Sequence, residues 1–169
     1  MKTLRQRCNA IELLIVDVDG VLTSGGIVYA SPEGEIKEFH VRDGSGLHLW
    51  RRAGKRTGLI TGRSSPLIER RAAEVGISWV MQGAVEKLPA YQRMLAEAGV
   101  GDEAVCYVGD DVPDVPLLRR CGLAVAVADA CPDVRAVAHY ITQAPGGRGA
   151  VRETVELILR CQQRWKDEG

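Results

Sequence analysis

The chain has 169 residues, and its 22 lysines and arginines are balanced by 22 aspartates and glutamates, so the formal net charge at pH 7 is zero. A chain of this length buries roughly 70% of the surface that its unfolded form exposes and needs no disulfide to hold a core. The balanced charge excludes general attraction to nucleic acid or to an anionic membrane. We therefore predict a single domain over residues 1–169 in which any anion is recognised by a local group of side chains.

Five cysteines are scattered along the chain without a C-x-x-C pair, which favours reduced thiols in a cytoplasm. The basic N-terminal segment is followed by an apolar stretch that contains Glu12 and Asp17 and offers no small-residue cleavage site. No uninterrupted apolar run approaches the ~20 residues of a membrane span. We expect a cytoplasmic protein with neither a signal peptide nor a membrane span.

The first predicted strand ends in two carboxylates one residue apart, Asp17 and Asp19. The stretch from Leu13 reads Leu-Leu-Ile-Val-Asp-Val-Asp-Gly-Val-Leu-Thr, which is typical of a strand covered on both faces. Because side chains alternate along a strand, the two carboxylates are expected to point the same way, and Gly20 lets the backbone turn away. Ligands bind at this carboxyl edge of open α/β sheets. Two like charges there require a cation or separate acid and base roles.

Two short extended segments, 27–30 and 35–41, flank the turn-forming sequence Ser31-Pro32-Glu33-Gly34 and predict a β-hairpin. Asp43 is then expected to cap a helix that continues to Ala53 and stops at Gly54. The remaining elements alternate between strands and helices: strands at 56–60, 78–81, 104–108, 123–128 and 139–142, and helices at 66–76, 87–98, near 115–120 and from 150 to about 164.

Repeated strand, helix, strand units with short connections imply right-handed crossovers and a parallel sheet. The fold class is therefore α/β, a three-layer, doubly wound parallel sheet with a small β-hairpin insertion. The spacing from Asp19 to Thr61 leaves room for the hairpin and one helix, so we expect no cap domain.

Candidate functional side chains follow several of these strands. Each is ordinary by itself, since a lone D-x-D pair often serves a cap or turn, a threonine caps helices and a lysine is usually solvated. Acidic groups gathered at one sheet edge would be destabilising without a cation, and Mg²⁺ binds a few carboxylates while keeping several waters. A magnesium site beside a hydroxyl, helix N-terminal amides and an ammonium favours phosphoryl transfer. The candidates are Asp17, Asp19, Thr61, Lys87, Asp110, Asp111 and Asp114.

The chain resembles the haloacid dehalogenase superfamily of aspartyl phosphatases, whose four motifs match, in order, Asp17-Val18-Asp19-Gly20, Thr61, Lys87 and Gly109-Asp110-Asp111-x-x-Asp114. Within it, the chain is similar to the 3-deoxy-D-manno-octulosonate 8-phosphate (Kdo-8-phosphate) phosphatase family. That likeness runs from about residue 11 to 158 through Val41-Arg42-Asp43-Gly44-x-Gly46, Ile60-Thr61-Gly62-Arg63, Gln82-Gly83, Tyr107-Val108-Gly109-Asp110-Asp111, Val125-Ala126-Val127-Ala128-Asp129-Ala130 and Gly146-Gly147-Arg148-Gly149-Ala150-Val151-Arg152-Glu153. The resemblance implies a capless homotetramer that makes the Kdo precursor of lipopolysaccharide.

The resemblance and the chemistry of the residues agree on the catalytic roles. Asp17 is expected to attack phosphorus and form an aspartyl-phosphate. Asp19 is expected to protonate the leaving alkoxide and then to take a proton from water. Thr61 and Lys87 are expected to hold the remaining phosphoryl oxygens.

A magnesium ion is the expected cofactor. Its predicted ligands are Asp17, the backbone carbonyl of Asp19 and Asp110, and it would offset the charge on the phosphoryl oxygens. Asp111 and Asp114 are expected to orient metal-bound waters or Lys87.

The implied substrate, a sugar acid phosphate, carries a carboxylate, for which arginine is the bidentate partner. Each arginine by itself also fits a surface ion pair, and a structural role fits a lone histidine as well. The predicted substrate-binding residues are Arg42, Asp43, Gly44, His48, Arg63, Arg71 and Arg148.

A capless site would be open to water, so a neighbouring subunit is expected to close it. The hairpin offers a small apolar surface, made by Ile27, Val28, Tyr29 and Ile36, that suits pairing with copies of itself. The alternative is that this surface packs on its own sheet. Arg148 could likewise reach an adjacent site, or the Gly-rich segment could be an ordinary turn between strand and helix.

Three other functions remain open. A phosphatase of a nine-carbon keto-deoxy sugar acid phosphate would share the same catalytic residues. A phospho-accepting receiver domain also gathers acidic residues, a threonine and a lysine at strand ends, but it would not need Asp19. A non-catalytic, oligomer-forming module of this fold would lack Asp17, Asp19 or Asp110, and all three are present.

Overall fold

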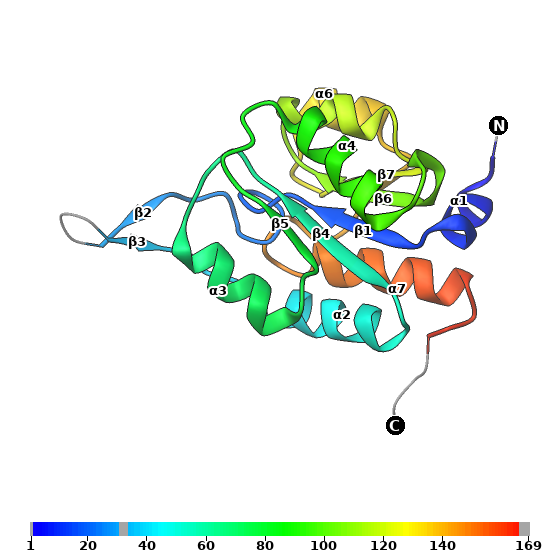
Figure 1. Ribbon diagram of the computed structural model, residues 1–169, viewed down its shortest axis with the longest axis horizontal. Coiled ribbons are helices and arrows are strands. Elements are labelled where there is room, and N and C mark those ends of the chain that lie inside the picture. Colours follow the sequence, from blue (N-terminus) through cyan, green and yellow to red (C-terminus); the bar gives the residue numbers. More distant parts are fainter. Residues whose placement is uncertain (1, 31–33, 166–169) are drawn as a thin grey trace.

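A six-stranded parallel sheet forms the centre of the computed structural model, which describes residues 2–30 and 34–165 (Figure 1). Its strands, in spatial order, are β5 (Trp79–Met81), β4 (Arg56–Ile60), β1 (Leu13–Val16), β6 (Val105–Gly109), β7 (Leu123–Ala126) and β8 (Tyr140–Ile141). Every neighbouring pair is parallel. The predicted doubly wound α/β fold is confirmed.

Helices cover both faces of the sheet, as Figure 1 shows. On one face lie α2 (Val41–Arg52), α3 (Pro66–Val75) and α7 (Ala150–Cys161). On the other face lie α4 (Lys87–Ala98) and α6 (Pro132–Val137), and α5 (Val115–Leu118) packs against α4 and α6. A short helix, α1 (Leu4–Ala10), packs on α7. Two 3₁₀ turns, η1 (Asp102–Ala104) and η2 (Val112–Asp114), complete the described elements.

The chain winds outward from β1 in one direction, through β4 to β5, and then returns to build β6, β7 and β8 on the other side. The loops that leave β1 and β6 therefore diverge to opposite faces of the sheet, which creates the crevice where ligands bind in this class of fold. All four residues of β1 are fully buried, in agreement with a central strand covered on both sides. Both loops are thus anchored in the core.

The hairpin stands away from the sheet (Figure 1). Its strands, β2 (Val28–Tyr29) and β3 (Glu35–Ile36), pair antiparallel, as predicted. Of the predicted turn, residues 31–33 lie outside the described residues. The side chains of Ile27, Val28, Tyr29 and Ile36 are about half exposed or more. The alternative that these residues pack on their own sheet is therefore wrong.

Several predicted boundaries need correction. The strand ends at Val16, before the aspartates, because the chain enters a turn at Val18 whose carbonyl accepts three backbone N–H groups. Asp43 does not cap its own helix, because α2 begins earlier and has His40 as its N-cap. The last helix ends at Cys161 rather than near residue 164, where Gln163 takes a positive φ of 57°.

Two helices were not predicted. Thr3 and Gln6 form a capping box at the start of α1, but Cys8 is the only buried residue of that helix, so no apolar stripe reveals it. The other, α6, is short and begins with a proline at its first position. Each helix of the described part of the chain is too short or too polar to cross a membrane.

Candidate active site

Three loops and one helix start meet around a cavity of about 420 Å³ at the carboxyl edge of the sheet. The loops follow β1, β4 and β6, and the helix is α4. Among the residues that line the cavity are eight of the predicted site residues: Asp17, Asp19, Thr61, Arg63, Lys87, Asp110, Asp111 and Asp114. The expected convergence of these side chains follows from the parallel register of the strands that carry them.

Lys87, the first residue of α4, is a buried cation between two carboxylates. Its Nζ lies 3.1 Å from Asp17 Oδ1 and 2.6 Å from Asp114 Oδ1. Burial by itself would lower the pKa of Lys87, but the carboxylates of Asp114 and Asp17 outweigh it and leave that pKa above its ordinary value. The ammonium therefore stays charged beside Asp17.

Asp114 is completely buried, and both of its oxygens are occupied. Lys87 Nζ and the Tyr107 hydroxyl donate to Oδ1, at 2.6 and 2.7 Å. The backbone N–H groups of Asp110 and Asp111 donate to Oδ2, at 3.0 and 3.3 Å. Asp114 thus fixes the β6 loop relative to Lys87 and has no free lone pair for a further ligand.

Asp110 and Asp17 carry the oxygens that fit a metal ion. Carboxylate oxygens of Asp17, Asp110 and Asp114 lie within 4.8 Å of one another. Oδ1 of Asp17 and Oδ1 of Asp110 are buried, and neither accepts a hydrogen bond from the described residues, although Lys87 forms an ion pair with the former. A hard divalent cation such as Mg²⁺ takes such carboxylate oxygens. The donor set therefore fits the predicted cofactor.

The pKa values of these two carboxyls support the same conclusion. Burial, followed by repulsion from Asp17 and Asp114, raises the pKa of Asp110 to about 8. Burial also raises the pKa of Asp17 to about 6, although Lys87 opposes the rise. The protein atoms alone therefore do not compensate both negative charges, whereas a cation would.

Glycines let the β6 and β1 loops approach closely. Gly20 has a φ of +89°, and a Cβ there would lie 2.0 Å from Asp110 Oδ2. The Gly-rich turn before α7 packs on the same loop: Gly147 N–H donates to the carbonyl of Val21 at 2.8 Å, and a Cβ on Gly146 would lie 1.7 Å from the Gly20 carbonyl oxygen. The turn thus braces the loop that carries Asp17 and Asp19.

Thr61 directly follows β4 and is only 2% exposed. Its hydroxyl oxygen accepts from Arg63 N–H at 3.4 Å, and its own N–H donates to the Met81 carbonyl. These contacts hold the side chain at the cavity across the sheet edge from Asp110.

Two residues of the hairpin reach the site, and the motifs did not predict them. Lys37 Nζ lies 2.5 Å from Asp19 Oδ1 and 3.3 Å from Glu35 Oε1. Arg63 contacts the same two carboxylates, at 3.8 Å from Asp19 and 3.3 Å from Glu35. The alternation of charged and apolar residues at 35–37 was the available signal, because it puts Glu35 and Lys37 on one side of the hairpin.

The other predicted substrate residues do not line this cavity in the described part of the chain. Asp43 is 1% exposed and accepts from the N–H groups of Gly149 and Arg152, so it caps α7 rather than α2. Gly44 lies against Arg71, since a Cβ there would be 2.4 Å from a guanidinium nitrogen.

The remaining members of this set lie around the start of α7 and on α2. Arg148 pairs with Glu38 at 3.0 Å, and both side chains are more than half exposed. Arg42 lines a separate pocket together with Arg148. His48 is half-buried on α2. Within a single chain, these arginines therefore do not reach the carboxylates of the site.

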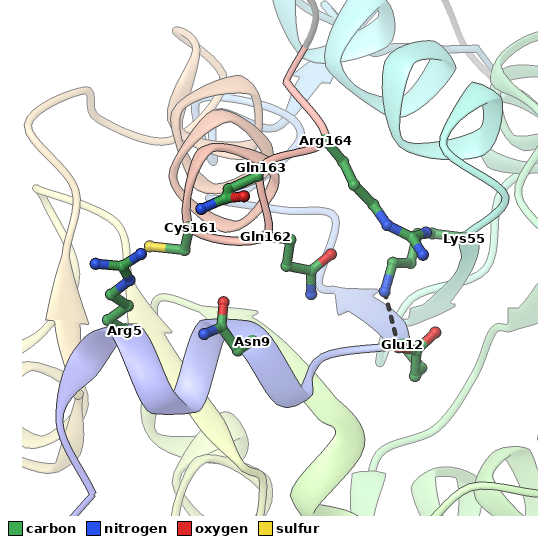
Figure 2. A pocket seen from close by; sticks show the side chains of 8 residues that line it. All are labelled: Arg5, Asn9, Glu12, Lys55, Cys161, Gln162, Gln163 and Arg164. Atoms are coloured by element: carbon green, nitrogen blue, oxygen red, sulfur yellow. Dashed lines mark hydrogen bonds and ion pairs between the residues drawn. The ribbon is translucent and has the colours of Figure 1, made fainter.

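A second polar pocket lies at the opposite, amino edge of the sheet, between α1 and the end of α7 (Figure 2). Its buried lysine, Lys55, donates to the Ile11 carbonyl at 2.6 Å and to Glu12 Oε1 at 2.9 Å. Lys55 ties the start of β4 to the start of β1, whereas Lys87, at the opposite edge, pairs with Asp17 after β1 and with Asp114 after β6.

Known proteins share these features. A family model described as haloacid dehalogenase-like hydrolase matches residues 72–151. The 3-deoxy-D-manno-octulosonate 8-phosphate phosphatase KdsC of Yersinia pestis is 46% identical over 160 residues, which cover 94% of this chain and 85% of that protein. The same enzyme of Salmonella typhi is 46% identical over 153 residues, 90% of this chain and 81% of the relative. The chain belongs to the Kdo-8-phosphate phosphatase family.

Solved structures of the Kdo-8-phosphate phosphatase family have the same fold. The Moraxella catarrhalis phosphatase, in complex with magnesium ion, phosphate ion and a KDO molecule, superposes with a TM-score of 0.92 at 43% identity and covers 94% of this chain and 91% of its own. The cobalt-bound phosphatase of Haemophilus influenzae gives 0.89 at 40% identity, with coverages of 93% and 92%. Between β1 and β4, the described residues hold only the hairpin and α2, so the expected absence of a cap domain there agrees with the fold.

Proposed function

We propose that this chain hydrolyses 3-deoxy-D-manno-octulosonate 8-phosphate to Kdo and phosphate, with Mg²⁺ as its cofactor. The observation that carries the proposal is the pair of buried carboxylate oxygens of Asp17 and Asp110 that accept no hydrogen bond within the described residues, beside the charged Lys87. Relatives that are 46% identical carry this substrate in their names.

Asp17 acts as the nucleophile. Its carboxylate attacks phosphorus to give an aspartyl-phosphate, which divides one difficult hydrolysis into two displacements. Lys87, 3.1 Å from Asp17, and the Thr61 hydroxyl at the same cavity hold the phosphoryl oxygens. Asp19, two residues after the nucleophile, gives a proton to the leaving oxygen and takes one from the attacking water.

The metal would be held by the side chains of Asp17 and Asp110 and by the backbone carbonyl of Asp19. When bound, Mg²⁺ offsets the negative charge of the phosphoryl group. Asp114 keeps Lys87 and the β6 loop in place, and the exposed Asp111 orients water around the metal.

Recognition of the sugar acid requires more of the molecule than one chain brings together. Arg63 lines the cavity, whereas Arg42, Arg71 and Arg148 lie outside it in the described part of the chain. We propose a homotetramer in which the exposed apolar side chains of the hairpin pair with other copies and Arg148 reaches a neighbouring site. Asp43, Gly44 and His48 then act by shaping α2 beneath these arginines.

This reaction yields a lipopolysaccharide precursor, and we place it in the cytoplasm. All five cysteines are free thiols, two of them only partly buried, which suits a reducing compartment.

The test is phosphate release with Mg²⁺, and with EDTA as the control, from eight-carbon and nine-carbon keto-deoxy sugar acid phosphates and from simple sugar phosphates. Preference for the eight-carbon acid is the expected result. Preference for the nine-carbon acid would keep the mechanism and change the substrate. No metal-dependent release from any ester would overturn the proposal.

A further inference from the structure

Lys37 of the hairpin is a buried cation whose role the family motifs leave unassigned. It directly follows β3, whose Ile36 is 51% exposed, yet only 3% of the Lys37 side chain is exposed. Its Nζ donates to Asp19 Oδ1 at 2.5 Å. A charged ammonium is stable in such a buried position only when it is paired and hydrogen-bonded.

The neighbours of Lys37 form a closed group of alternating charge. Glu35 forms an ion pair with Lys37 at 3.3 Å and accepts a hydrogen bond from Arg63 at 3.3 Å. Arg63 completes the ring at 3.8 Å from the second oxygen of Asp19. Glu35 therefore holds two cations beside Asp19 and offsets their mutual repulsion, so the position of Lys37 is fixed from two sides.

We propose that Lys37 is a positioning residue for Asp19, which holds Oδ1 and leaves Oδ2 to carry the proton in phosphoryl transfer. Oδ2 is buried and accepts no hydrogen bond in the described part of the chain, although Arg63 forms a long ion pair with it at 3.8 Å, and Asp19 lines the cavity. A carboxyl group that is protonated on Oδ2 still accepts through Oδ1, so the contact with Lys37 is compatible with both steps. The inference rests on the proposed phosphatase function.

The two steps depend on Asp19 in different ways. In the first, a bond forms from Asp17 to phosphorus, the bond from phosphorus to the leaving oxygen breaks, and that oxygen takes the proton of Asp19. In the second, a water oxygen bonds to phosphorus, the aspartyl bond breaks, and Asp19 recovers a proton from the water. A sugar alkoxide needs the proton in order to leave, whereas p-nitrophenolate leaves without it.

The test compares the octulosonate 8-phosphate with p-nitrophenyl phosphate in Lys37→Met. Because kcat/KM reports only the steps up to departure of the leaving group, we expect it to fall by about 10- to 100-fold for the sugar ester and by less than about 3-fold for the aryl ester. Since the second step slows for both, p-nitrophenolate should appear in a burst equal to the enzyme concentration. Lys37→Arg keeps a charged donor and should restore most of the sugar-ester activity.

Lys55 provides the matched control. Its side chain is 2% exposed and pairs with Glu12 at 2.9 Å, but it lies at the amino edge of the sheet (Figure 2). Lys55→Met removes an equally buried ammonium, whose partner Glu12 is more exposed than Asp19, without touching Asp19. We expect a lower melting temperature, an unchanged ratio of the two kcat/KM values and no burst.

An equal fall of kcat/KM for both esters, or no fall for either, would overturn the positioning role. If Lys37→Met does not fold, Lys37→Gln takes its place. The glutamine side chain is shorter than that of lysine, so its amide keeps a polar group at this position but cannot reach Asp19. If the wild-type protein prefers another alkyl phosphate, that ester replaces the octulosonate, and only the substrate proposal fails. A wild-type protein without metal-dependent turnover would refute both proposals.

Discussion

Asp17 and Asp114 have the same side chain and different surroundings, and the surroundings separate their roles. Asp114 is fully buried and accepts four hydrogen bonds, so it serves as a fixed anion for Lys87. Asp17 keeps one buried oxygen that no described residue satisfies by a hydrogen bond, and burial raises its pKa to about 6. An incompletely satisfied carboxylate of this kind is available to attack phosphorus, whereas Asp114 is not.

Replacement of Asp17 tests its role as the nucleophile. We expect Asp17→Asn to lower kcat by at least about 10³-fold, because the amide cannot form the aspartyl-phosphate. The fold should survive, because the amide has the same shape and removes a charge that burial disfavours. Phosphate release and thermal unfolding measure the two effects, with the exposed Asp133→Asn as the control. Turnover that persists in Asp17→Asn would exclude this residue as the nucleophile.

At the scale of elements, the loop after β1 is held by segments that are distant in sequence. The Gly-rich turn donates a hydrogen bond from Gly147 to Val21 and lies against the backbone of Gly20 and Thr23. That turn is in turn fixed by Asp43, which accepts from the first amides of α7. The site geometry therefore depends on α2 and α7 as well as on the sheet.

Gly147→Ala should damage this support. Gly147 has a φ of +62°, and a Cβ there would lie 2.3 Å from the Thr23 carbonyl carbon. We expect a loss of about 2–4 kcal/mol in unfolding free energy, from backbone strain plus overpacking, and a lower kcat because the loop moves.

Gly54→Ala is the matched control for Gly147→Ala. Gly54 also has a positive φ, +76°, but a Cβ there meets nothing within 4 Å among the described residues. Gly54→Ala should lower the unfolding free energy only by the backbone strain, about 1 kcal/mol, and leave kcat unchanged. Denaturant unfolding and kcat are measured for both variants. Equal effects of the two substitutions would refute the bracing role of the turn.

Most elements were predictable because their signals are local. Pro66 and Gly76 bound α3, Lys87 and Gly99 bound α4, and the predicted strand at 56–60 agrees with β4 at both ends. The convergence of the candidate site residues was predictable for a related reason: parallel strands bring their carboxyl ends to one edge whatever the details of the crossovers.

The remaining contacts depend on how distant segments pack. Asp43 accepts a hydrogen bond from the N–H group of Gly149, which lies 106 residues later in the chain. Nothing in the local sequence distinguishes this role from that of a cap on α2. The contact of Lys37 with Asp19 was not predicted, because a loop separates the two residues and the pattern of apolar residues does not determine the path of a loop. Arg148 pairs with Glu38 within one chain, and its proposed reach into a neighbouring site involves a second copy, which a single sequence does not describe.

At the scale of the whole molecule, the hairpin is the feature whose apolar side chains stay exposed in a single chain. Tyr29 is 77% exposed and Ile36 51% exposed, on a two-stranded ribbon that is marginal in water without further packing. Its strand β3 leads directly into Lys37 and so connects the exposed surface to the site.

A polar substitution on the hairpin should therefore change both assembly and activity. We expect Ile36→Ser to shift the protein to a smaller species, as measured by light scattering after size exclusion, and to lower kcat for the sugar ester. Ile141→Ser is the control, since Ile141 is 37% exposed at the sheet edge, far in sequence from the hairpin. An unchanged molar mass in Ile36→Ser would rule out the hairpin as the contact between copies.

Removal of the metal should make stability depend on pH. The pKa values of Asp17 and Asp110 in the folded protein, about 6 and about 8, lie above the ordinary 3.8, so without metal the folded state binds more protons than the unfolded state between about pH 4 and 8. Stability then falls as pH rises through that window. Thermal unfolding in EDTA should follow this decline, and Mg²⁺ should raise the melting temperature more at pH 8 than at pH 5, because protons compete for its ligands.

Asp110→Asn should flatten the dependence of the melting temperature on pH in EDTA and remove most of the Mg²⁺ effect, whereas Asp133→Asn should leave both unchanged. Melting temperatures that run parallel with and without Mg²⁺ across the whole range would show that these carboxylates do not hold the metal.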